Sequence, residues 1–574
     1  MSTSALQTSA AKSLPRVNVA DHLSNIALKN PDAVAVAAPG SGDVAGKNSY
    51  STCTFAELEQ DASALARGLM ELGIRPGTRL VLLVPPGIQF VKLVFALLRS
   101  GATTILMDPG MGRKHLVHCL AALQPQGFVA VPRAQAVRAV LRNRFPNATF
   151  NITVGRRWLW GGWTYKRLLA LGQKSPLDLP NTEAEDLAAI ITTSGSTGPP
   201  KGVLYTHGMF ATQVHEIQKQ YTIYPGGTDL ACFPLFGLFN SAMGITTVFP
   251  DMNFSRPALA DPQKLLTAAN DWQVTQAFAS PAVWKKFSAY CAEKGEKVPT
   301  LRKVFSCGAP VPAEVLRKTL DAVAAHAEMH TPYGATESLP VATIEANEVL
   351  DQTSVQTDKG AGICVGRKFD TVEWRIIRIV DQPIESIEHT EELPAGETGE
   401  LIVRGPQVSI KYVTEDLECE DTTHPMPQST HNSLAKISDG NTGWHRMGDV
   451  GYLDVQGRFW YCGRKAHRVV HAEETLYTIP CEAIFNTHPL VLRTALVGVG
   501  PTGIAAPVLV VEPVENANIE SLKTELLQMA GAHPLTRAIQ QVLFHPSLPV
   551  DIRHNSKINR EQLTLWATSQ LRNS

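Results

Sequence analysis

The sequence lacks the features that mark several large classes of protein. Its nine cysteines are scattered over 574 residues without a C-x-x-C pair, which argues against a disulfide framework or a zinc site. The most apolar stretch, residues 79–107, is interrupted by Pro85, Pro86, Lys92 and Arg99 and does not provide the roughly 20 apolar residues that span a bilayer. The formal net charge is -1, and no basic or acidic tract indicates a nucleic-acid partner or a disordered regulator. We therefore predict a cytoplasmic protein without a transmembrane segment, for which peripheral membrane contact stays open.

The length and the apolar content allow one or two domains with large cores. Residues 1–16 are rich in Ser, Ala and Thr and contain Lys12 and Arg16 but no acid. A transit peptide has this composition, but a frayed polar terminus is the favoured interpretation.

Helical and strand-like patterns alternate in the N-terminal half. Thr54 and Glu57 form a capping-box pattern ahead of apolar residues at helical spacing over 58–72. Residues 80–84 read as a buried strand, and a second helix is predicted over 89–100. Such alternation predicts an α/β fold with largely parallel sheets, in which ligands gather beyond the carboxyl ends of the strands.

A loop rich in hydroxyl groups and glycine follows the strand-like run 187–191. Residues 192–202 read Thr-Thr-Ser-Gly-Ser-Thr-Gly-Pro-Pro-Lys-Gly. Glycine lets successive backbone N–H groups converge on an anion, and the hydroxyls and Lys201 add donors and charge. The loop differs from the P-loop of NTPases because Pro200 precedes the lysine and Gly202 follows it. A phosphate-binding loop is predicted, although this composition alone is also that of a surface linker.

The order of residues in this loop resembles the signature loop of the adenylate-forming superfamily, which comprises acyl-CoA synthetases, luciferases and peptide-synthetase adenylation domains. Further motifs of that superfamily follow in its order: Tyr333-Gly334-Ala335-Thr336-Glu337, Gly396-Glu397-Thr398-Gly399-Glu400 with Tyr412, Met447-Gly448-Asp449-Val450-Gly451, Gly463-Arg464 and Ser556-Lys557-Ile558-Asn559-Arg560. The resemblance implies a large N-terminal domain over residues 1–462, with mostly parallel sheets flanked by helices. It also implies a small mobile α+β domain over residues 463–574, which carries Lys557.

The resemblance implies ATP and Mg²⁺ as co-reactants and assigns roles to the matching residues. The phosphate loop would contain Thr192, Ser194, Gly195, Ser196, Thr197, Gly198 and Lys201. Adenine would lie against Gly308, Ala309, Pro310 and Tyr333, and the ribose against Asp449 and Arg464. Thr336 would contact the α-phosphate, Glu337 would hold Mg²⁺, and Lys557 would reach the α-phosphate and the carboxylate. Taken singly, these residues also have ordinary structural interpretations, such as a helix start, a turn or a solvated charge.

Residues 233–244 form an aromatic and aliphatic segment that we expect to line an acyl pocket, through Phe233, Phe236, Gly237 and Phe239. The segment contains no carboxylate to pair with an ammonium group, so an apolar acid is favoured over an amino acid. Gly237 stands where the superfamily often has His. Ordinary core packing would use the same residues.

The hinge region differs from the common hinge motif of the superfamily, and this difference indicates which branch of the superfamily the chain resembles. Ala466 occupies the usual position of a charged hinge residue, and residues 469–478 lack the glycine that opens the superfamily's thioester-forming face. The segments 108–113, 331–342 and 463–469 resemble the β-lactone synthetases of bacterial long-chain olefin biosynthesis. That likeness implies adenylation of a 2-alkyl-3-hydroxy acid, closure of a β-lactone by its own hydroxyl, and partner enzymes of that pathway.

Several alternatives stay open from the sequence. A fatty acid–CoA ligase or fatty acyl-AMP ligase is the second hypothesis, and a non-catalytic acyl- or nucleotide-binding relative is the third. His207, His467 and His471 are candidate bases by position alone. Residues 414–442 are polar and predict a surface insertion, and the G-x-G-x-x-G spacing over 498–503 predicts a strand–turn–strand rather than a dinucleotide site.

Overall fold

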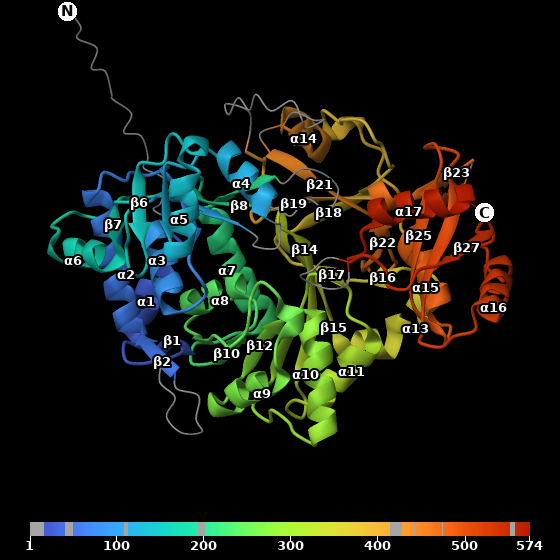
Figure 1. Cartoon of the computed structure of the whole chain (residues 1–574), viewed down its shortest axis with the longest axis horizontal. Coiled ribbons are helices and arrows are strands. Elements are labelled where there is room, and N and C mark those ends of the chain that lie inside the picture. Colours follow the sequence, from blue (N-terminus) through green and yellow to red (C-terminus); the bar gives the residue numbers. More distant parts are fainter. Residues whose placement is uncertain are drawn as a thin grey trace, which may run out of the picture.

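The computed structural model describes residues 17–40, 50–107, 113–192, 201–413, 428–440, 442–472, 474–550 and 557–573. The structure contains two large sheets, a smaller antiparallel sheet and a C-terminal α+β unit (Figure 1), and the first two strands of the chain belong to the second large sheet. Among the described residues, no helix combines the length and the apolar character needed to cross a bilayer. None of their eight cysteines forms a disulfide.

A seven-stranded sheet, in the order β7-β6-β5-β3-β4-β8-β9, is parallel except for the β8–β9 pair. Its strands are β3 (Arg79–Leu83), β4 (Thr103–Leu106), β5 (Gly127–Ala130), β6 (Phe150–Thr153), β7 (Trp163–Thr164), β8 (Leu187–Thr192) and β9 (Gly202–Thr206). Its helices are α2 (Phe55–Glu71), α3 (Ile88–Arg99), α4 (Arg113–Ala122), α5 (Pro132–Val140) and α6 (Tyr165–Lys174). The phosphate-loop residues 193–200 therefore connect β8 to β9, at the carboxyl end of β8.

A nine-stranded sheet, in the order β17-β15-β14-β13-β12-β10-β11-β1-β2, is parallel from β14 to β1. Its strands are β1 (Val34–Pro39), β2 (Tyr50–Thr54), β10 (Thr228–Ala231), β11 (Thr246–Val248), β12 (Gln276–Ala279), β13 (Lys303–Ser306), β14 (Glu328–Ala335), β15 (Ser338–Glu345) and β17 (Arg367–Lys368). Helices α1 (Asp21–Lys29), α7 (His207–Tyr221), α8 (Pro234–Met243), α9 (Pro262–Asp271), α10 (Pro281–Lys294), α11 (Ala313–Asp321), α12 (Ala346–Glu348) and α13 (Ser354–Asp358) accompany it. These two sheets confirm the predicted α/β class.

A smaller antiparallel sheet follows, in the order β16-β22-β21-β19-β18, with β20 beside β21. Its elements are β16 (Ile363–Cys364), β18 (Glu373–Ile377), β19 (Gly399–Arg404), α14 (Gln428–Ala435), β20 (Lys436–Asp439), β21 (Thr442–Leu453) and β22 (Phe459–Arg464). Residues 414–427 lie outside the described part of the chain. The predicted surface insertion is wrong for residues 428–439, because β20 pairs with β21 and Ile437 is 1% exposed.

The C-terminal segment builds cores of its own. Its elements are β23 (Val469–His471), β24 (Glu474–Leu476), α15 (Thr478–Asn486), β25 (Val491–Val499), β26 (Ala506–Pro513), α16 (Ile519–Ala532), β27 (Gln541–Phe544) and α17 (Arg560–Asn573). The buried apolar clusters here contain only residues from 469 onward, which confirms a separate C-terminal α+β unit. Strand β22 continues to Arg464, which pairs with Asp449, so the predicted boundary at 462/463 falls inside this strand.

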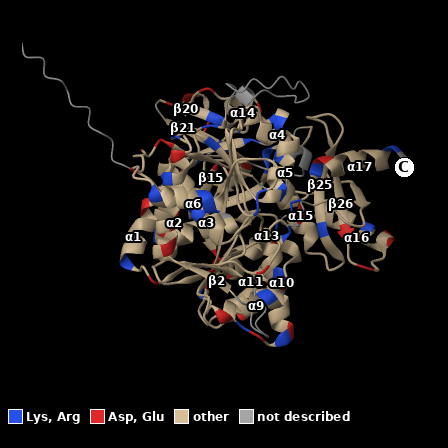
Figure 2. Ribbon diagram, turned by 60° about the vertical axis from the view of Figure 1, so that its left-hand side comes forward, with Lys and Arg blue, Asp and Glu red and all other residues tan. Residues whose placement is uncertain are grey.

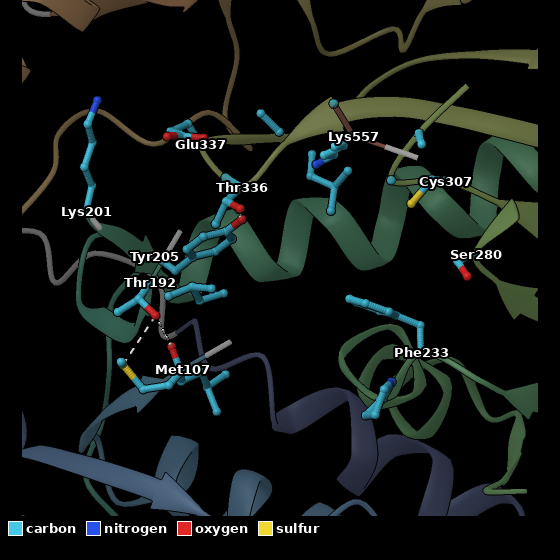
Figure 3. Close-up of a pocket in the computed structure, with 18 of the residues that line it drawn as sticks. Met107, Thr192, Lys201, Tyr205, Phe233, Ser280, Cys307, Thr336, Glu337 and Lys557 are labelled. Atoms are coloured by element: carbon cyan, nitrogen blue, oxygen red, sulfur yellow. Dashed lines mark hydrogen bonds between the residues drawn. The ribbon is translucent and has the colours of Figure 1, made fainter. Parts of the chain in front are cut away.

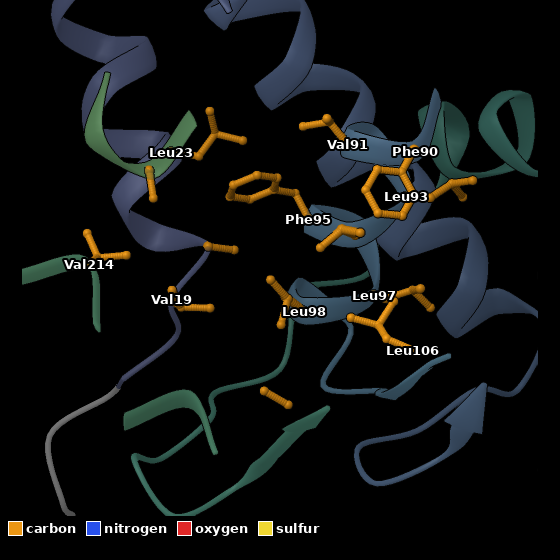
Figure 4. Close-up of a cluster of buried hydrophobic side chains, with 14 of the residues drawn as sticks. Val19, Leu23, Phe90, Val91, Leu93, Phe95, Leu97, Leu98, Leu106 and Val214 are labelled. Carbon is orange, nitrogen blue, oxygen red and sulfur yellow. The ribbon is translucent and has the colours of Figure 1, made fainter. Parts of the chain in front are cut away.

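Local sequence signals account for several of these elements. Thr54 Oγ1 accepts from the Glu57 N–H at 3.2 Å, and a Glu57 carboxylate oxygen accepts from the Thr54 N–H at 2.9 Å, which confirms the capping box at α2. Strands β25 and β26 pair antiparallel across the G-x-G-x-x-G turn, so the strand–turn–strand prediction is also confirmed. Helix α3 is apolar on nearly all sides, and its side chains form the centre of the largest core (Figure 4).

Candidate active site

One cavity of about 2330 Å³ joins the two large sheets, the smaller sheet and the C-terminal unit. It gathers most of the predicted site residues from distant parts of the sequence (Figure 3). The predicted residues that line it are Thr192, Lys201, Phe233, Phe239, Gly308, Ala309, Pro310, Tyr333, Thr336, Glu337, Asp449, Arg464 and Lys557. Ser194, Gly195, Ser196, Thr197 and Gly198 lie outside the described residues, as does the side chain of Phe236.

Gly237 does not belong to this lining. A Cβ added there would lie 3.2 Å from Cβ of Ala231 and 3.3 Å from Cγ2 of Thr247. This side of α8 therefore packs against strands β10 and β11, and a larger side chain would meet the sheet. The placement of Gly237 in the acyl pocket is corrected accordingly, because the opposite face of α8 supplies the cavity wall.

Asp449 is the centre of a buried polar corner between β14, β21 and β22. Its carboxylate is 6% exposed and accepts hydrogen bonds from Arg464 Nη1 at 2.8 Å and from the Tyr333 hydroxyl. The negative charge of Asp449 raises the pKa of Arg464, and burial, followed by Asp449, raises the pKa of Tyr333, so the guanidinium stays charged and the phenol stays protonated over the physiological range. A carboxylate fixed in this way keeps lone pairs that can accept from two neighbouring hydroxyls of a sugar.

Glu337 belongs to a second polar corner, at the turn between β14 and β15. The Tyr412 hydroxyl donates to Glu337 Oε1 at 2.7 Å, and Nζ of Lys201 lies 4.9 Å from the centre of the Tyr412 ring. Lys436 approaches the same ring at 5.3 Å. Burial lowers the pKa of Lys201 and lowers that of Lys436 to about 7. This corner holds two half-buried lysines near one carboxylate, an arrangement that favours a bound anion.

The chemistry of this corner also fits Mg²⁺. The described residues contain no group of three or more His, Cys, Asp or Glu side chains that would form a complete protein site for a metal ion. Mg²⁺ commonly binds one or two carboxylates and completes its shell with water and substrate phosphates. Glu337 offers such a carboxylate beside the cationic end of the cavity.

Lys557 reaches the cavity from the C-terminal unit, and its side chain lines the cavity together with Thr336 and Cys307 (Figure 3). The chain just beyond it is anchored by Arg560, which donates to both carboxylate oxygens of Glu482 at 2.5 and 3.0 Å. Glu482 also accepts from the Leu496 N–H at 2.7 Å. One buried ion pair thus ties the start of α17 to α15 and β25 and holds the segment that carries Lys557.

The opposite end of the cavity is apolar. Its wall includes Phe90, Phe95, Phe210, Phe233, Leu238, Phe239 and Phe278. Two serine hydroxyls face this region, Ser280 and Ser306, which are 7% and 0% exposed and have no hydrogen-bond partner among the described residues. They lie at the carboxyl ends of neighbouring parallel strands, where Ala279 pairs with Ser306.

The three histidines proposed as bases have different surroundings. His207 and His471 are not part of the cavity wall, and Nδ1 of His471 bonds to the Ala505 carbonyl at 3.0 Å. His467 does line the cavity, and burial, with Arg560 and Arg464 nearby, lowers its pKa to about 4. His467 is therefore neutral at physiological pH, and it is the one histidine of the three positioned to meet a ligand.

A buried ion-pair cluster holds the chain just before the C-terminal unit. Glu400 and Arg446 are each 1% exposed and lie 2.6 Å apart. Lys465 donates to Glu400 and to the Val380 carbonyl, both at 3.1 Å. Ala466, the next residue, is exposed.

Sequence reasoning missed Ser280, Ser306, Lys436 and Tyr205, and assigned Tyr412 only to a motif. Tyr205 is buried and donates to the Thr336 carbonyl. Lys436 lies in a polar segment that carries no motif, and serines beside apolar strands are common. Only the folded register brings these side chains to the cavity.

The comparisons with known proteins agree with this geometry. The chain is 44% identical to the olefin beta-lactone synthetase of Xanthomonas campestris pv. campestris and 43% identical to that of Stenotrophomonas maltophilia. Each alignment covers 96% of this chain and 98% of the relative. The fold resembles the amide bond synthetase of Marinactinospora thermotolerans, with a TM-score of 0.74, 21% identity and coverage of 96% of this chain and 99% of the other.

A second solved structure has the same fold with nucleotide and metal bound. The o-succinylbenzoate CoA synthetase of Bacillus subtilis in complex with ATP and magnesium ion superimposes with a TM-score of 0.70 at 18% identity, covering 94% of this chain and 98% of the other. The sequence profile of AMP-binding enzymes matches residues 23–413, which include both large sheets and the polar corner around Glu337 and Tyr412. The chain belongs to the AMP-binding enzyme family.

Proposed function

We propose that this enzyme activates a hydrophobic 3-hydroxy carboxylic acid with ATP and then closes it to a β-lactone. In the first step a carboxylate oxygen attacks the α-phosphate, which forms an acyl adenylate and releases pyrophosphate. In the second step the acid's own 3-hydroxyl attacks the acyl carbon, loses its proton and displaces AMP. The observation that carries the proposal is the 44% identity, over nearly the whole chain, to an enzyme named olefin beta-lactone synthetase.

The polar end of the cavity would perform the first step. Members of this family generally use ATP and Mg²⁺. Lys201 and Lys557 would neutralise the two anions that must meet, while Glu337 would hold Mg²⁺ against the phosphates. Asp449 would accept from the ribose hydroxyls, with Arg464 beside it as its counter-ion. Fixed charges that lie where negative charge develops lower the barrier without reorganisation during the reaction.

The apolar end would hold the acyl chain and present the hydroxyl. Within the described part of the chain, the buried hydroxyls of Ser280 and Ser306 have no hydrogen-bond partner, and a substrate hydroxyl would satisfy them. Intramolecular attack needs no second substrate, and well-oriented reactions of this kind reach effective molarities of about 10⁵ M or more. His467 is the neutral imidazole that would accept the hydroxyl proton.

We also propose that the small domain, predicted over residues 463–574, moves about the segment around Ala466, while residues 463–465 stay with the large domain. Lys465 and the residues before it are held by the buried Glu400–Arg446 pair. Segment 469–478 lacks the glycine that opens the thioester-forming face in the superfamily. This absence agrees with a second step that uses the acid's own hydroxyl and no thiol such as CoA. A cytoplasmic location and association with other olefin-pathway enzymes follow from this function.

The product test uses the purified chain with ATP, Mg²⁺ and a syn-2-alkyl-3-hydroxy long-chain acid, with and without CoA. Mass spectrometry is expected to show a β-lactone and AMP in equal amounts, with no dependence on CoA. The matched substrate is the same acid without the 3-hydroxyl, which should stop at the adenylate. An acyl-CoA product that forms only with CoA would contradict lactone formation and assign a fatty acid–CoA ligase. Adenylate without lactone would assign a fatty acyl-AMP ligase.

A further inference from the structure

Helix α5 buries a polar side chain and exposes apolar ones, the reverse of an ordinary surface helix. Its most buried side chain is Gln135, which is 0% exposed and donates to the carbonyls of Phe128 at 3.1 Å and Ile152 at 3.0 Å. Val137 and Val140 are 55% and 83% exposed on the outer side. A glutamine thus anchors the helix to β5 and β6, while apolar side chains face outward.

The loop between β6 and β7 extends this apolar surface. Trp158 is 67% exposed and Leu159 is fully exposed, and the Trp158 and Trp160 rings stack at 6.1 Å. The loop begins against the first turn of α5, because a Cβ added to Gly155 would lie 3.5 Å from Cδ of Pro132. The start of the loop and the first turn of α5 are therefore neighbours, and we call the exposed side chains of α5 and of residues 155–162 together the α5 face.

The segment of sequence that contains the α5 face carries charge of a single sign. Residues 109–177 contain eleven Lys and Arg residues and no Asp or Glu, in a chain whose net charge is -1. Arg133, Arg142, Arg144, Arg156 and Arg157 are all exposed. Basic segments surround α4 and α5 in Figure 2. Aromatic and aliphatic side chains surrounded by arginine are typical of proteins that bind the interface of an anionic membrane.

The large cavity reaches the surface at this face. Val137 and Leu141 line both the cavity and a shallow apolar depression that they form with Ala136 and Val140. Behind them, Leu116, Val117, Leu120 and Phe145 give the cavity an apolar branch between α4 and α5. An apolar molecule that leaves a bilayer at the α5 face would thus enter the cavity without crossing water.

We propose that the α5 face docks on anionic lipid bilayers, with Trp158 and Leu159 inserted among the lipids and the arginines on the headgroups. The apolar branch between α4 and α5 then serves as the entrance for a membrane-dissolved acid. The entrance role rests on the proposed function, but docking itself requires neither substrate nor turnover. Failure of docking therefore leaves lactone formation untouched, and failure of lactone formation leaves docking untouched.

The test is co-sedimentation of the full chain with vesicles of phosphatidylcholine and phosphatidylglycerol, compared with phosphatidylcholine alone. We expect binding to the anionic vesicles that weakens as salt is raised. Each basic residue near an anionic membrane strengthens binding about fivefold, so R156Q/R157Q should weaken it about 25-fold. Leu159→Ser removes an inserted side chain and should weaken it about tenfold.

Matched controls test whether the effect comes from the α5 face or from any loss of positive charge or apolar surface. K285Q/K523Q removes two exposed lysines elsewhere, and Val455→Ser removes a side chain that is 95% exposed between β21 and β22. Both controls should bind as the parent chain does. Brominated lipid should quench tryptophan fluorescence in the parent chain, and Trp158→Phe should lose most of this quenching.

Three outcomes would overturn the proposal. The first is no binding to anionic vesicles, and the second is an equal loss in the control variants. The third is a chain that sediments through the α5 face without vesicles, which would make the face a protein interface. Thermal unfolding of each variant, expected to match the parent because the altered side chains are exposed, excludes loss of folding as the cause.

Discussion

At one end of the cavity Asp449 accepts from Arg464 and Tyr333, while at the other end the Ser280 and Ser306 hydroxyls have no partner among the described residues. The polar end is organised before a ligand binds, since each acid is already held by a neighbour. The apolar end leaves its hydroxyl groups to be satisfied by the ligand. Preorganised charge at the polar end favours catalysis with ATP, whichever acid is bound. Unsatisfied hydroxyl groups at the apolar end favour discrimination between carboxylic acids that have a matching hydroxyl and those that do not.

The largest effect is expected from removing a charge at the polar end of the cavity. Lys557→Ala should lower the rate of acyl-adenylate formation about 10³-fold, as measured by pyrophosphate release, because one charge on the reacting groups is lost. ATP binding by calorimetry should change little. Lys523→Ala, on the surface of α16, is the matched control. Near-normal pyrophosphate release in K557A would show that Lys557 does not act in this step.

A second change weakens nucleotide binding at the same end. Asp449→Asn should raise the KM for ATP about 100-fold, because two charge-assisted hydrogen bonds become neutral ones. Asp439→Asn alters a carboxylate that is also ion-paired, to Arg404, but does not line the cavity, and it should leave KM unchanged. An equal rise in both variants would indicate a general loss of structure instead.

A smaller effect distinguishes the apolar end. Ser280→Ala and Ser306→Ala should each lower kcat/KM for a 3-hydroxy acid about fivefold, since each removes one hydrogen bond. The same acid without the hydroxyl should react equally well in variant and parent. Ser288→Ala, a buried serine of α10 that bonds to the Lys285 carbonyl, is the control. If both acids are affected alike, the serines do not recognise the hydroxyl.

The smallest effect on activity concerns Asp229, beneath α8. Burial raises the pKa of Asp229 to about 7, although Asn240 donates to its carboxylate at 2.8 Å. A raised pKa means that the folded protein holds this proton more tightly than the unfolded chain does. Stability therefore falls as the pH rises from about 4 to about 7.

Asp229→Asn should remove this part of the pH dependence and raise the melting temperature above pH 7, with activity within about twofold of the parent. Asp271→Asn, in the last turn of α9, should retain the slope. Thermal unfolding between pH 4 and pH 8 measures the difference. An unchanged slope in D229N would mean that Asp229 is not the group that titrates.

The sequence predicted the polar end far better than the apolar end, for a physical reason. Contacts to phosphate, ribose and metal need particular donors and acceptors at fixed spacing, so Thr336, Glu337, Asp449 and Lys557 stand in recognisable motifs. An apolar wall needs only volume and shape, which many sequences supply. Gly237 was therefore placed on the wrong side of α8, and the contributions of α3 and α5 to the wall were not predicted.

Tertiary pairing explains the remaining differences. Lys436 lies in a polar stretch that has no strand pattern of its own. It forms strand β20 only through its pairing with β21. The boundary before Gly463 came from a motif, whereas the sheet continues to Arg464 through its pairing with Asp449. The Glu57 capping box and the β25–β26 turn were predicted correctly because those signals act over a few residues.

The contacts of Lys465 limit where along the chain the proposed domain movement can pivot. Lys465 is clamped to Glu400 and Val380 on the large part of the molecule, and the exposed Ala466 follows it directly. Arg468, two residues further on, also donates to Asp381 of the large part at 2.6 Å, so a movement about Ala466 would have to break this ion pair. In the proposed movement the C-terminal unit would carry Lys557 with it, so the state of the Arg468–Asp381 ion pair would report whether Lys557 is in the cavity.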